Sequence, residues 1–310
     1  EKLFYAFQDD WSKFNLAGIQ TYTTSAYFNR TQLMLKSLKD LGRENRRSEV
    51  KIIDMVPANF SDHPDDKHDA ISVAIVAKAK DELWEGEQRL YVDKSSFFEE
   101  WRLVRNQNDD GWLLDNIVQR GTQTPYQEIA KLLTFANQNN FIYSGDFGWL
   151  LMPKRGQLFS KASFKKSDIN SHVIGLYRSV LVQFYSYLPS KNQTSTTGYV
   201  IAQATVPKSY GNIVVRRKTW WRFWTPGKLM RVVPEWGDFN KKYDVFASDI
   251  ERVTSLELLH PAFMVKLEAL VFKTSIEVVD NNVYFYTDDK KADYQSMLKL
   301  LHEAFDEMKL

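Results

Sequence analysis

Apolar residues near the start of the chain recur at helical spacing in two successive stretches. Across residues 2–16 they lie one, three or four positions apart and form one helical face: Leu3, Phe4, Phe7, Trp11 and Phe14. Residues 26–41 repeat the pattern and are followed by Gly42, a residue type that commonly ends helices. The pattern therefore predicts two amphipathic helices.

Five shorter stretches follow that are typical of β-strands, because they are rich in β-branched and aromatic residues. Within the middle stretches, apolar residues alternate with polar residues. They are residues 49–56, 70–79, 87–92, 96–106 and 112–119. The segment from Asn108 to Gly111 separates the last two and is a hairpin turn signal. Helices followed by an antiparallel series of strands predict an α+β domain in which a curved sheet wraps on helices.

The pattern breaks between Arg120 and Pro125, which predicts a domain boundary, with domains at residues 1–122 and 123–310. The elements expected in the second domain are helices at 126–139, 256–271 and 291–310, strands at 172–187, 199–206 and 213–215, and a hairpin at 275–286. This combination predicts a second α+β domain that is rich in antiparallel strands.

The net charge of the chain, +2, hides an uneven distribution along the sequence. Residues 147–234 hold 14 Lys or Arg residues and a single acid, Asp168. The flanks are acidic, with 18 basic and 23 acidic residues in 1–146, and 9 and 15 in 235–310. Such a block attracts an external anionic partner or pairs with the acidic flanks inside one fold, and the sequence leaves both possibilities open.

Residues 214–231 place part of this positive charge among aromatic side chains and contain no acid. The candidate lipid- or anion-binding residues are Arg216, Arg217, Lys218, Trp220, Trp221, Arg222, Trp224, Lys228 and Arg231. Each basic residue near an anionic membrane contributes about 1 kcal/mol, and tryptophan suits the depth of the headgroups. The same residues also suit single-stranded nucleic acid, whose bases stack on aromatic side chains between phosphate contacts. Alternatively, Trp220 and Phe223 could be core residues, with the basic residues on the solvent side. We expect an anionic membrane surface or a protein partner.

No motif for a familiar reaction occurs in the sequence. Glycine-rich phosphate and dinucleotide motifs, the nucleophile elbow and the HExxH zinc motif are absent. The spacing of His63 and His68 matches no familiar zinc pattern, and the chain has no cysteine. No apolar run reaches the about 18 residues of a membrane span. We therefore expect a protein that is not an enzyme and uses no cofactor or metal.

An alternative places a small-molecule site, or an active site, inside the cone of the first domain. The candidate pocket residues are Asp54, Tyr91 and Trp101. Asp54 and Tyr91 could point into the interior of a conical α+β sheet or could equally be rim residues, and Trp101 would line the same cavity. A ribosome-associated or RNA-binding module is a further alternative, because the same fold class can serve there.

The first 120 residues carry a longer pattern in four segments. These are Glu49–Pro57, Asp69–Ala77, Phe97–Arg105 and Gly111–Gln119, and the last two hold the signature FFEEWRLVR followed by WLLDNI. The pattern resembles the Tim-forty-four-like domain, which takes its name from a peripheral subunit of the mitochondrial inner-membrane import motor and also has bacterial versions.

This resemblance implies a cystatin-like or nuclear-transport-factor-two-like cone with a large apolar pocket. It also implies peripheral association with anionic membranes and a docking role without catalysis. Residues 238–249 and 259–264 resemble a bacterial domain of unknown function. Together the resemblances imply a bacterial, membrane-associated binding or scaffold protein. Because the chain begins inside a helical pattern, we also expect that a preceding segment, which could be an anchor, was removed.

Overall fold

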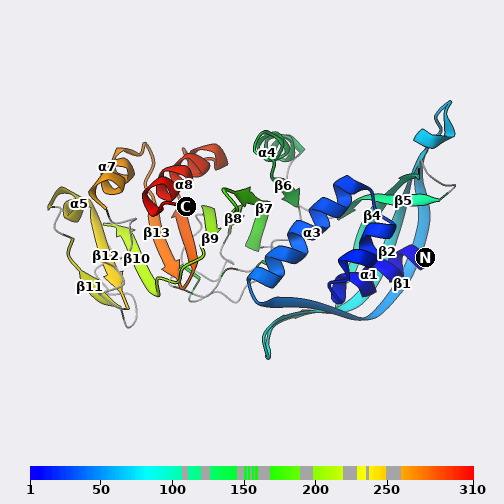
Figure 1. The fold of residues 1–310 in the computed structure, drawn as a ribbon, viewed down its shortest axis with the longest axis horizontal. Helices are drawn as coiled ribbons and strands as arrows, with labels where there is room; N and C mark the ends of the chain where they lie inside the picture. The colour runs from blue at the N-terminus through cyan, green and yellow to red at the C-terminus, as the bar shows by residue number, and fades with distance from the viewer. Residues whose placement is uncertain are drawn as a thin grey trace. The chain divides into compact units, whose positions relative to one another are not determined.

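The chain folds into two compact units, Glu1–Gln123 and Thr124–Leu310, and each combines helices with an antiparallel sheet (Figure 1). The computed structural model describes residues 1–106, 111–119, 126–144, 150–151, 153, 156, 158–159, 168–188, 198–218, 229–234, 237–248 and 260–310. The expected α+β class is confirmed, and the two units divide one residue after the expected boundary.

The described residues of the first unit form a five-stranded antiparallel sheet. Its strands, in spatial order, are β1 (Arg43–Ser61), β2 (Ala70–Glu85), β4 (Ser96–Arg105) and β5 (Trp112–Gln119), with β3 (Gln88–Asp93) also paired to β2. The pairing of β1 with β2 shifts register three times, and such bulges bend a strand. The five expected strands are confirmed, and β1 and β2 extend well beyond their expected ends.

Helices α1 (Lys2–Ser12) and α3 (Ser25–Asp40) pack on this sheet (Figure 1), and the short helix α2 (Leu16–Thr21) packs against both of them. The expected first helix was too long, because Phe14 takes a left-handed conformation with a φ of 55°. Asn15 then caps a separate helix by accepting a hydrogen bond from the amide of Gly18. Helix α3 ends as expected before Gly42, whose φ of 68° suits glycine. Helices on a curved antiparallel sheet are the expected cone-like arrangement.

The described residues of the second unit form a nine-stranded antiparallel sheet. Its spatial order is β11-β12-β10-β13-β14-β9-β8-β7-β6. The strands are β6 (Ile142–Ser144), β7 (Ile169–Tyr177), β8 (Val180–Tyr187), β9 (Tyr199–Thr205), β10 (Asn212–Arg217), β11 (Met230–Val232), β12 (Tyr243–Ala247), β13 (Ser275–Val279) and β14 (Asn282–Thr287). The expected hairpin at 275–286 is the pair β13 and β14.

The expectation of one strand across residues 172–187 was wrong. The chain turns back at Arg178 and Ser179, whose φ angles are 50° and 65°, and joins β7 to β8 as a two-residue hairpin. Neither residue is a turn former of the Gly or Asn type, so the sequence lacks the usual signal. The guanidinium of Arg178 lies 2.6 Å from the carboxylate of Asp306 and donates to the carbonyl of Leu310. These contacts fix the turn to the end of the last helix.

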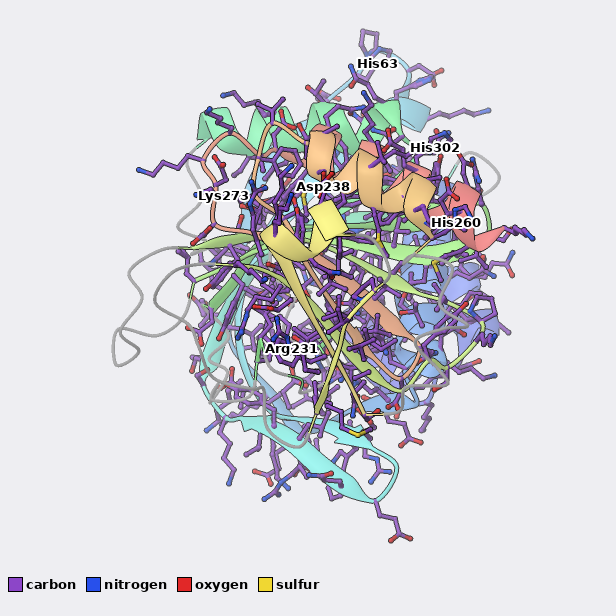
Figure 2. The ribbon with its side chains drawn as sticks, turned by 90° about the vertical axis from the view of Figure 1, so that its left-hand side faces the viewer. His63, Arg231, Asp238, His260, Lys273 and His302 are labelled. Carbon is purple, nitrogen blue, oxygen red and sulfur yellow. The ribbon has the colours of Figure 1, made fainter. Side chains whose placement is uncertain are left out.

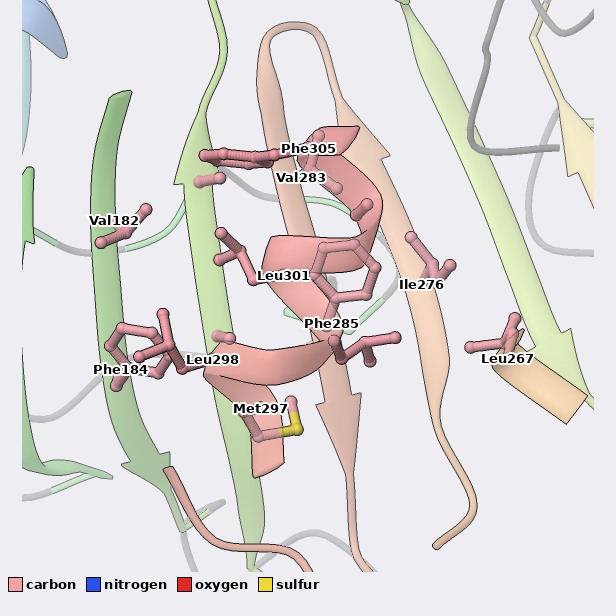
Figure 3. Close-up of a cluster of buried hydrophobic side chains, with 14 of the residues drawn as sticks. Val182, Phe184, Leu267, Ile276, Val283, Phe285, Met297, Leu298, Leu301 and Phe305 are labelled. Atoms are coloured by element: carbon pink, nitrogen blue, oxygen red, sulfur yellow. The ribbon is translucent and has the colours of Figure 1, made fainter. Parts of the chain in front are cut away.

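The helices of the second unit are α4 (Tyr126–Gln138), α5 (Gly237–Lys242), α7 (Pro261–Ala269) and α8 (Tyr294–Met308). As expected, α8 buries its apolar face on the sheet, with Leu301 and Phe305 beside Val283 and Phe285 (Figure 3). Helix α7 begins at Pro261, with His260 as its N-cap. The preceding part of the expected helix, residues 256–259, lies outside the described residues.

A second buried cluster, apart from the core under the helices, combines aromatic and polar side chains of the same sheet. Tyr185 donates from its hydroxyl to Gln203 over 2.9 Å, and Gln203 donates to Asn282 over 3.3 Å. The ring of Phe159 covers this cluster, with its centroid 5.0 Å from that of Tyr187. Both sides of the central strands are therefore buried.

Candidate anion-binding site

Basic side chains of the stretch 214–231 gather around Asp244 at one edge of the second sheet. Nη2 of Arg231 lies 3.0 Å from Oδ1 of Asp244, and Nζ of Lys218 lies 3.7 Å from the same oxygen. Arg216 stands directly opposite Asp244 in the pairing of β10 with β12. Since β11 is the last strand at this edge in the described sheet, Arg231 belongs to the sheet margin.

The alternation of side chains along β10 decides which basic residues share a side. Arg216 and Lys218 are two positions apart and therefore lie on one side of the sheet, whereas Arg217 points to the other. The guanidinium carbon of Arg217 lies 5.8 Å from the ring centroid of Tyr243, which belongs to the core under the helices. This corrects the expectation that Arg216 and Arg217 form one docking face.

Arg216 requires a second correction, because only 9% of it is exposed. Its guanidinium carbon lies 5.2 Å from the ring centroid of Phe246, a buried residue of β12. A buried guanidinium cannot touch a membrane surface directly, although strand register places Arg216 opposite Asp244. Direct contact is left to Lys218 and Arg231, whose side chains are 36% and 59% exposed.

Hydrogen bonds of Lys218 hold this edge of the sheet together. Lys218 continues the ladder beyond β10, with its backbone amide donating to the carbonyl of Lys242 over 2.7 Å. Its ammonium group also donates to the backbone carbonyl of Asn240. On the neighbouring margin Val233 is exposed beside Arg231, whereas the exposed Met230 points to the other side of the sheet. Cationic and apolar side chains thus share the margin. Figure 2 shows Arg231 away from Asp238 and His260, which lie at the helices.

Five of the nine candidate residues lie outside the described residues: Trp220, Trp221, Arg222, Trp224 and Lys228. The candidate residues that the structure describes test whether the basic block pairs with the acidic flanks inside the fold. Lys218 and Arg231 contact Asp244, and Arg178 contacts Asp306, so three cations of the block pair with acids of the C-terminal segment. The internal pairing that the sequence left open therefore accounts for part of the block.

The candidate pocket in the first unit is filled at Trp101. This side chain is buried, and its ring centroid lies 5.4 Å from that of Phe4 and 5.5 Å from that of Phe7, both on α1. Its indole nitrogen donates to the carboxylate of Glu99 over 2.8 Å. Trp101 is therefore a core residue that fastens α1 to the sheet, which corrects its assignment to a pocket.

Asp54 and Tyr91 do not join Trp101. On β2, Tyr91 pairs with Leu83 and Trp101 pairs with Val73. These two partners are ten positions apart, a distance on the order of 30 Å along a strand. Asp54 is exposed, and Tyr91 is half-buried on the short strand β3. The three candidates therefore form no common site, which corrects the expectation of a shared pocket.

Sequence reasoning missed Asp244, although this residue organises the site. It lies in the acidic C-terminal segment, far along the chain from Arg216 and Lys218. The pairing of β10 with β12 brings them together, and no local pattern reports that register. Among the residues that the structure places, no group of three or more His, Cys, Asp or Glu side chains could hold a metal.

The comparisons with known proteins give weak similarities. No family model matches the chain, and no curated protein matches it, so the resemblance of the first 120 residues stays a prediction. A solved structure of the mycobacterial trehalose monomycolate transport factor A, TtfA, is similar at 12% identity and a TM-score of 0.44, over 59% of this chain and 96% of that chain.

Two further solved structures are less similar. The intermembrane space region of the chloroplast protein ARC6 has 9% identity and a TM-score of 0.28, over 36% of this chain and 88% of that chain. An Ntf2-like protein involved in plasmid conjugation has 12% identity and a TM-score of 0.22, over 64% of this chain and 83% of that chain. We draw no functional conclusion from these similarities. No helix within the described ranges is long and apolar enough to cross a membrane.

Proposed function

We propose that this chain is a non-catalytic scaffold that docks peripherally on an anionic membrane surface through the sheet edge around Arg231. The observation that carries the proposal is that two exposed cations, Lys218 and Arg231, lie at one margin of the sheet together with the exposed apolar residue Val233. Membrane surfaces favour this combination, because cations meet the headgroups while apolar side chains enter the interface.

The charge of the surrounding sequence supports the same proposal. Residues 147–234 hold 14 basic residues against one acid, and the described pairs neutralise only part of this excess. Attraction to an anionic leaflet falls off within about 8 Å at physiological salt, so the basic residues have to lie close to the lipid. Membership of the Tim-forty-four-like family and a bacterial origin are part of the proposal and rest on the sequence pattern.

The alternatives have less support from the described residues. A ligand site or active site in the first unit would need an open cone, and Trp101 packs there against Phe4 and Phe7. A nucleic-acid partner would use the same cations as the membrane, so it is distinguished by measurement. The expectation that the protein is not an enzyme stays part of the proposal.

The test is co-flotation with neutral and with anionic vesicles at physiological salt. The double variant Lys218→Glu/Arg231→Glu reverses the exposed cations of the site. The control Lys241→Glu/Lys273→Glu makes the same charge change at exposed lysines elsewhere in the second unit. Because each cation contributes about 1 kcal/mol, we expect the site variant to lose at least about 30-fold in its partition coefficient for anionic vesicles.

The control should bind nearly as wild type does, and circular dichroism should show that both variants are folded. Equal binding by the two folded variants would contradict the assignment of the site. Tighter, steeply salt-dependent binding to single-stranded RNA than to any vesicle would replace the membrane by nucleic acid.

A further inference from the structure

Gln183 on β8 is a buried carboxamide on the face of the second sheet that is turned away from the helices. Its neighbours Val182 and Phe184 belong to the core under the helices, beside α8 (Figure 3), so alternation along the strand turns Gln183 to the opposite face. Only 1% of Gln183 is exposed. Its Oε1 atom lies 3.1 Å from Nε2 of His172 on β7, whereas its Nε2 atom has no hydrogen-bond partner among the described residues.

A second buried donor without a partner lies on the same face, two strands away. Ser144 on β6 pairs with His172. Gln183 pairs with Ile174, two positions further along β7. Because paired residues and residues two positions apart share a face, Ser144 and Gln183 both face away from the helices. Ser144 is 1% exposed, and its hydroxyl likewise has no hydrogen-bond partner within the described part of the chain.

The neighbouring amide shows how such a group is usually satisfied in a protein interior. Gln203 stands directly opposite Gln183 in the pairing of β8 with β9. It accepts a hydrogen bond from Tyr185 and donates one to Asn282. A buried donor that stays unpaired costs stability, and most buried polar groups therefore have partners. The donors of Gln183 and Ser144 thus point to an acceptor that does not belong to the described chain.

The backbone beside these donors is irregular in a way that supports a binding site. The register of β7 against β8 shifts between Asn170 and Val173, so Ser171 and His172 form a bulge. Ser171 is buried and has a φ of 57°, a left-handed conformation that is uncommon outside glycine. The hydroxyl of Tyr294 donates to its carbonyl over 2.7 Å and holds this conformation. Bulges redirect side chains and are frequent next to functional sites.

The residues of these strands select an uncharged ligand. Strands β6, β7 and β8 contain no Asp, Glu, Lys or Arg residue. Their single histidine, His172, is buried, and burial lowers its pKa to about 4, so the imidazole is neutral at pH 7. An ionised ligand would be buried here without a counter-charge from these strands, which is costly. A neutral carbonyl oxygen avoids this cost and accepts hydrogen bonds from an amide and a hydroxyl.

We propose that Gln183 and Ser144 form a binding site for a small uncharged molecule that carries a carbonyl oxygen, such as an amide or an ester. Both side chains donate to the ligand, and Ile174, buried on the strand between them, provides an apolar wall. This site goes beyond the proposed membrane docking. In the described sheet five strands separate β8 from β11, the strand of Arg231, so either role can fail without the other.

The experiment titrates two probes into the full chain at pH 7: N-methylacetamide, a neutral amide, and acetate, an anion of similar size. Side-chain amide resonances of Gln183 and imidazole resonances of His172 report binding by NMR. We expect N-methylacetamide to shift both sets saturably and acetate to leave them unchanged. Gln183→Met keeps the approximate size of the side chain and loses the donors, so N-methylacetamide should bind at least about tenfold more weakly, as judged from His172.

Stability distinguishes a ligand site from a structural role of the same amide. Gln183→Met removes an unpaired donor, so its urea denaturation midpoint without probe should equal or exceed that of wild type. The control Gln119→Met makes the same exchange at an amide that donates to Glu99 over 2.8 Å in the first unit. It should bind N-methylacetamide as wild type does.

Three results would overturn the proposal. Acetate binding as tight as that of N-methylacetamide would contradict the uncharged class. Absence of saturable binding, with a loss of stability in Gln183→Met, would give the amide a purely structural role. If Gln183→Met does not fold, Ser144→Ala, which removes one oxygen atom, carries the test, and unchanged binding of N-methylacetamide by this variant would exclude the site.

Discussion

The backbone amide of Leu158 donates a hydrogen bond to the carboxylate of Glu277 over 2.7 Å. Glu277 lies on β13 and is buried, and the neighbouring Phe159 is buried as well. Gly156 approaches the same carboxylate so closely that a Cβ atom there would lie 2.1 Å from Oε1 of Glu277 and 2.6 Å from Cγ2 of Val279. A buried carboxylate thus holds this described part of the chain against the sheet.

This contact predicts that Gly156→Ala destabilises the second unit. The added methyl group would displace Glu277 and weaken its hydrogen bond to Leu158, at a cost of about 1–3 kcal/mol in the free energy of unfolding. Urea denaturation followed by circular dichroism measures the loss. The control is Gly237→Ala, where a Cβ atom meets nothing within 4 Å. Similar stabilities for the two variants would show that the carboxylate does not confine Gly156.

His172 predicts a loss of stability in mild acid. Burial lowers its pKa to about 4, and the hydrogen bond to Gln183 opposes this only in part. The unfolded chain takes up the proton near pH 6.5 and the folded chain does not, so the unfolded state binds more protons between these values. The stabilising contribution is complete above about pH 6.5 and decreases toward pH 4, by about 3 kcal/mol in total.

Denaturation midpoints at pH 7 and pH 4.5 test this effect. Replacing His172 with Asn removes the titrating group, so the variant should lose less stability than wild type between the two pH values. His260→Asn is the control, because His260 is exposed and Asn can also cap α7. Should His172→Asn lose as much stability as wild type, the acid sensitivity would have to come from other groups.

Trp101 predicts that the first unit depends on its filled cone. Trp101→Ala removes the ring that packs on Phe4 and Phe7 and should cost about 3–5 kcal/mol. Phe98→Ala, at an exposed position of the same strand, should cost under about 1 kcal/mol. Thermal denaturation compares the two variants. If Trp101→Ala stayed folded and as stable as wild type, and bound apolar dyes, Trp101 would line a pocket instead of filling a core.

The elements set by local periodicity were predictable from the sequence. Helix α8 buries the face that its spacing indicates, including Met297, Leu301 and Phe305, because a 3.6-residue repeat of apolar side chains needs no information from elsewhere. The five strands of the first unit and the hairpin turned near Asp280 follow from alternation and turn residues in the same way.

The candidate site was only partly predictable, for a different reason. The sequence showed a basic stretch, but strand alternation separates Arg217 from Arg216, and packing on Phe246 buries Arg216. Asp244 enters the site through strand register, which depends on residues far apart in the chain.

The sequence by itself determined the α+β class, most helices and strands, and the excess of positive charge, since each follows from residue type and short-range spacing. Only the tertiary structure decided that the chain reverses at Arg178 and Ser179, where contacts with α8 stabilise a turn without glycine. It also decided that Lys218 and Arg231 share the carboxylate of Asp244. Contacts between distant segments form when strands pair, and no local pattern encodes which strands become neighbours.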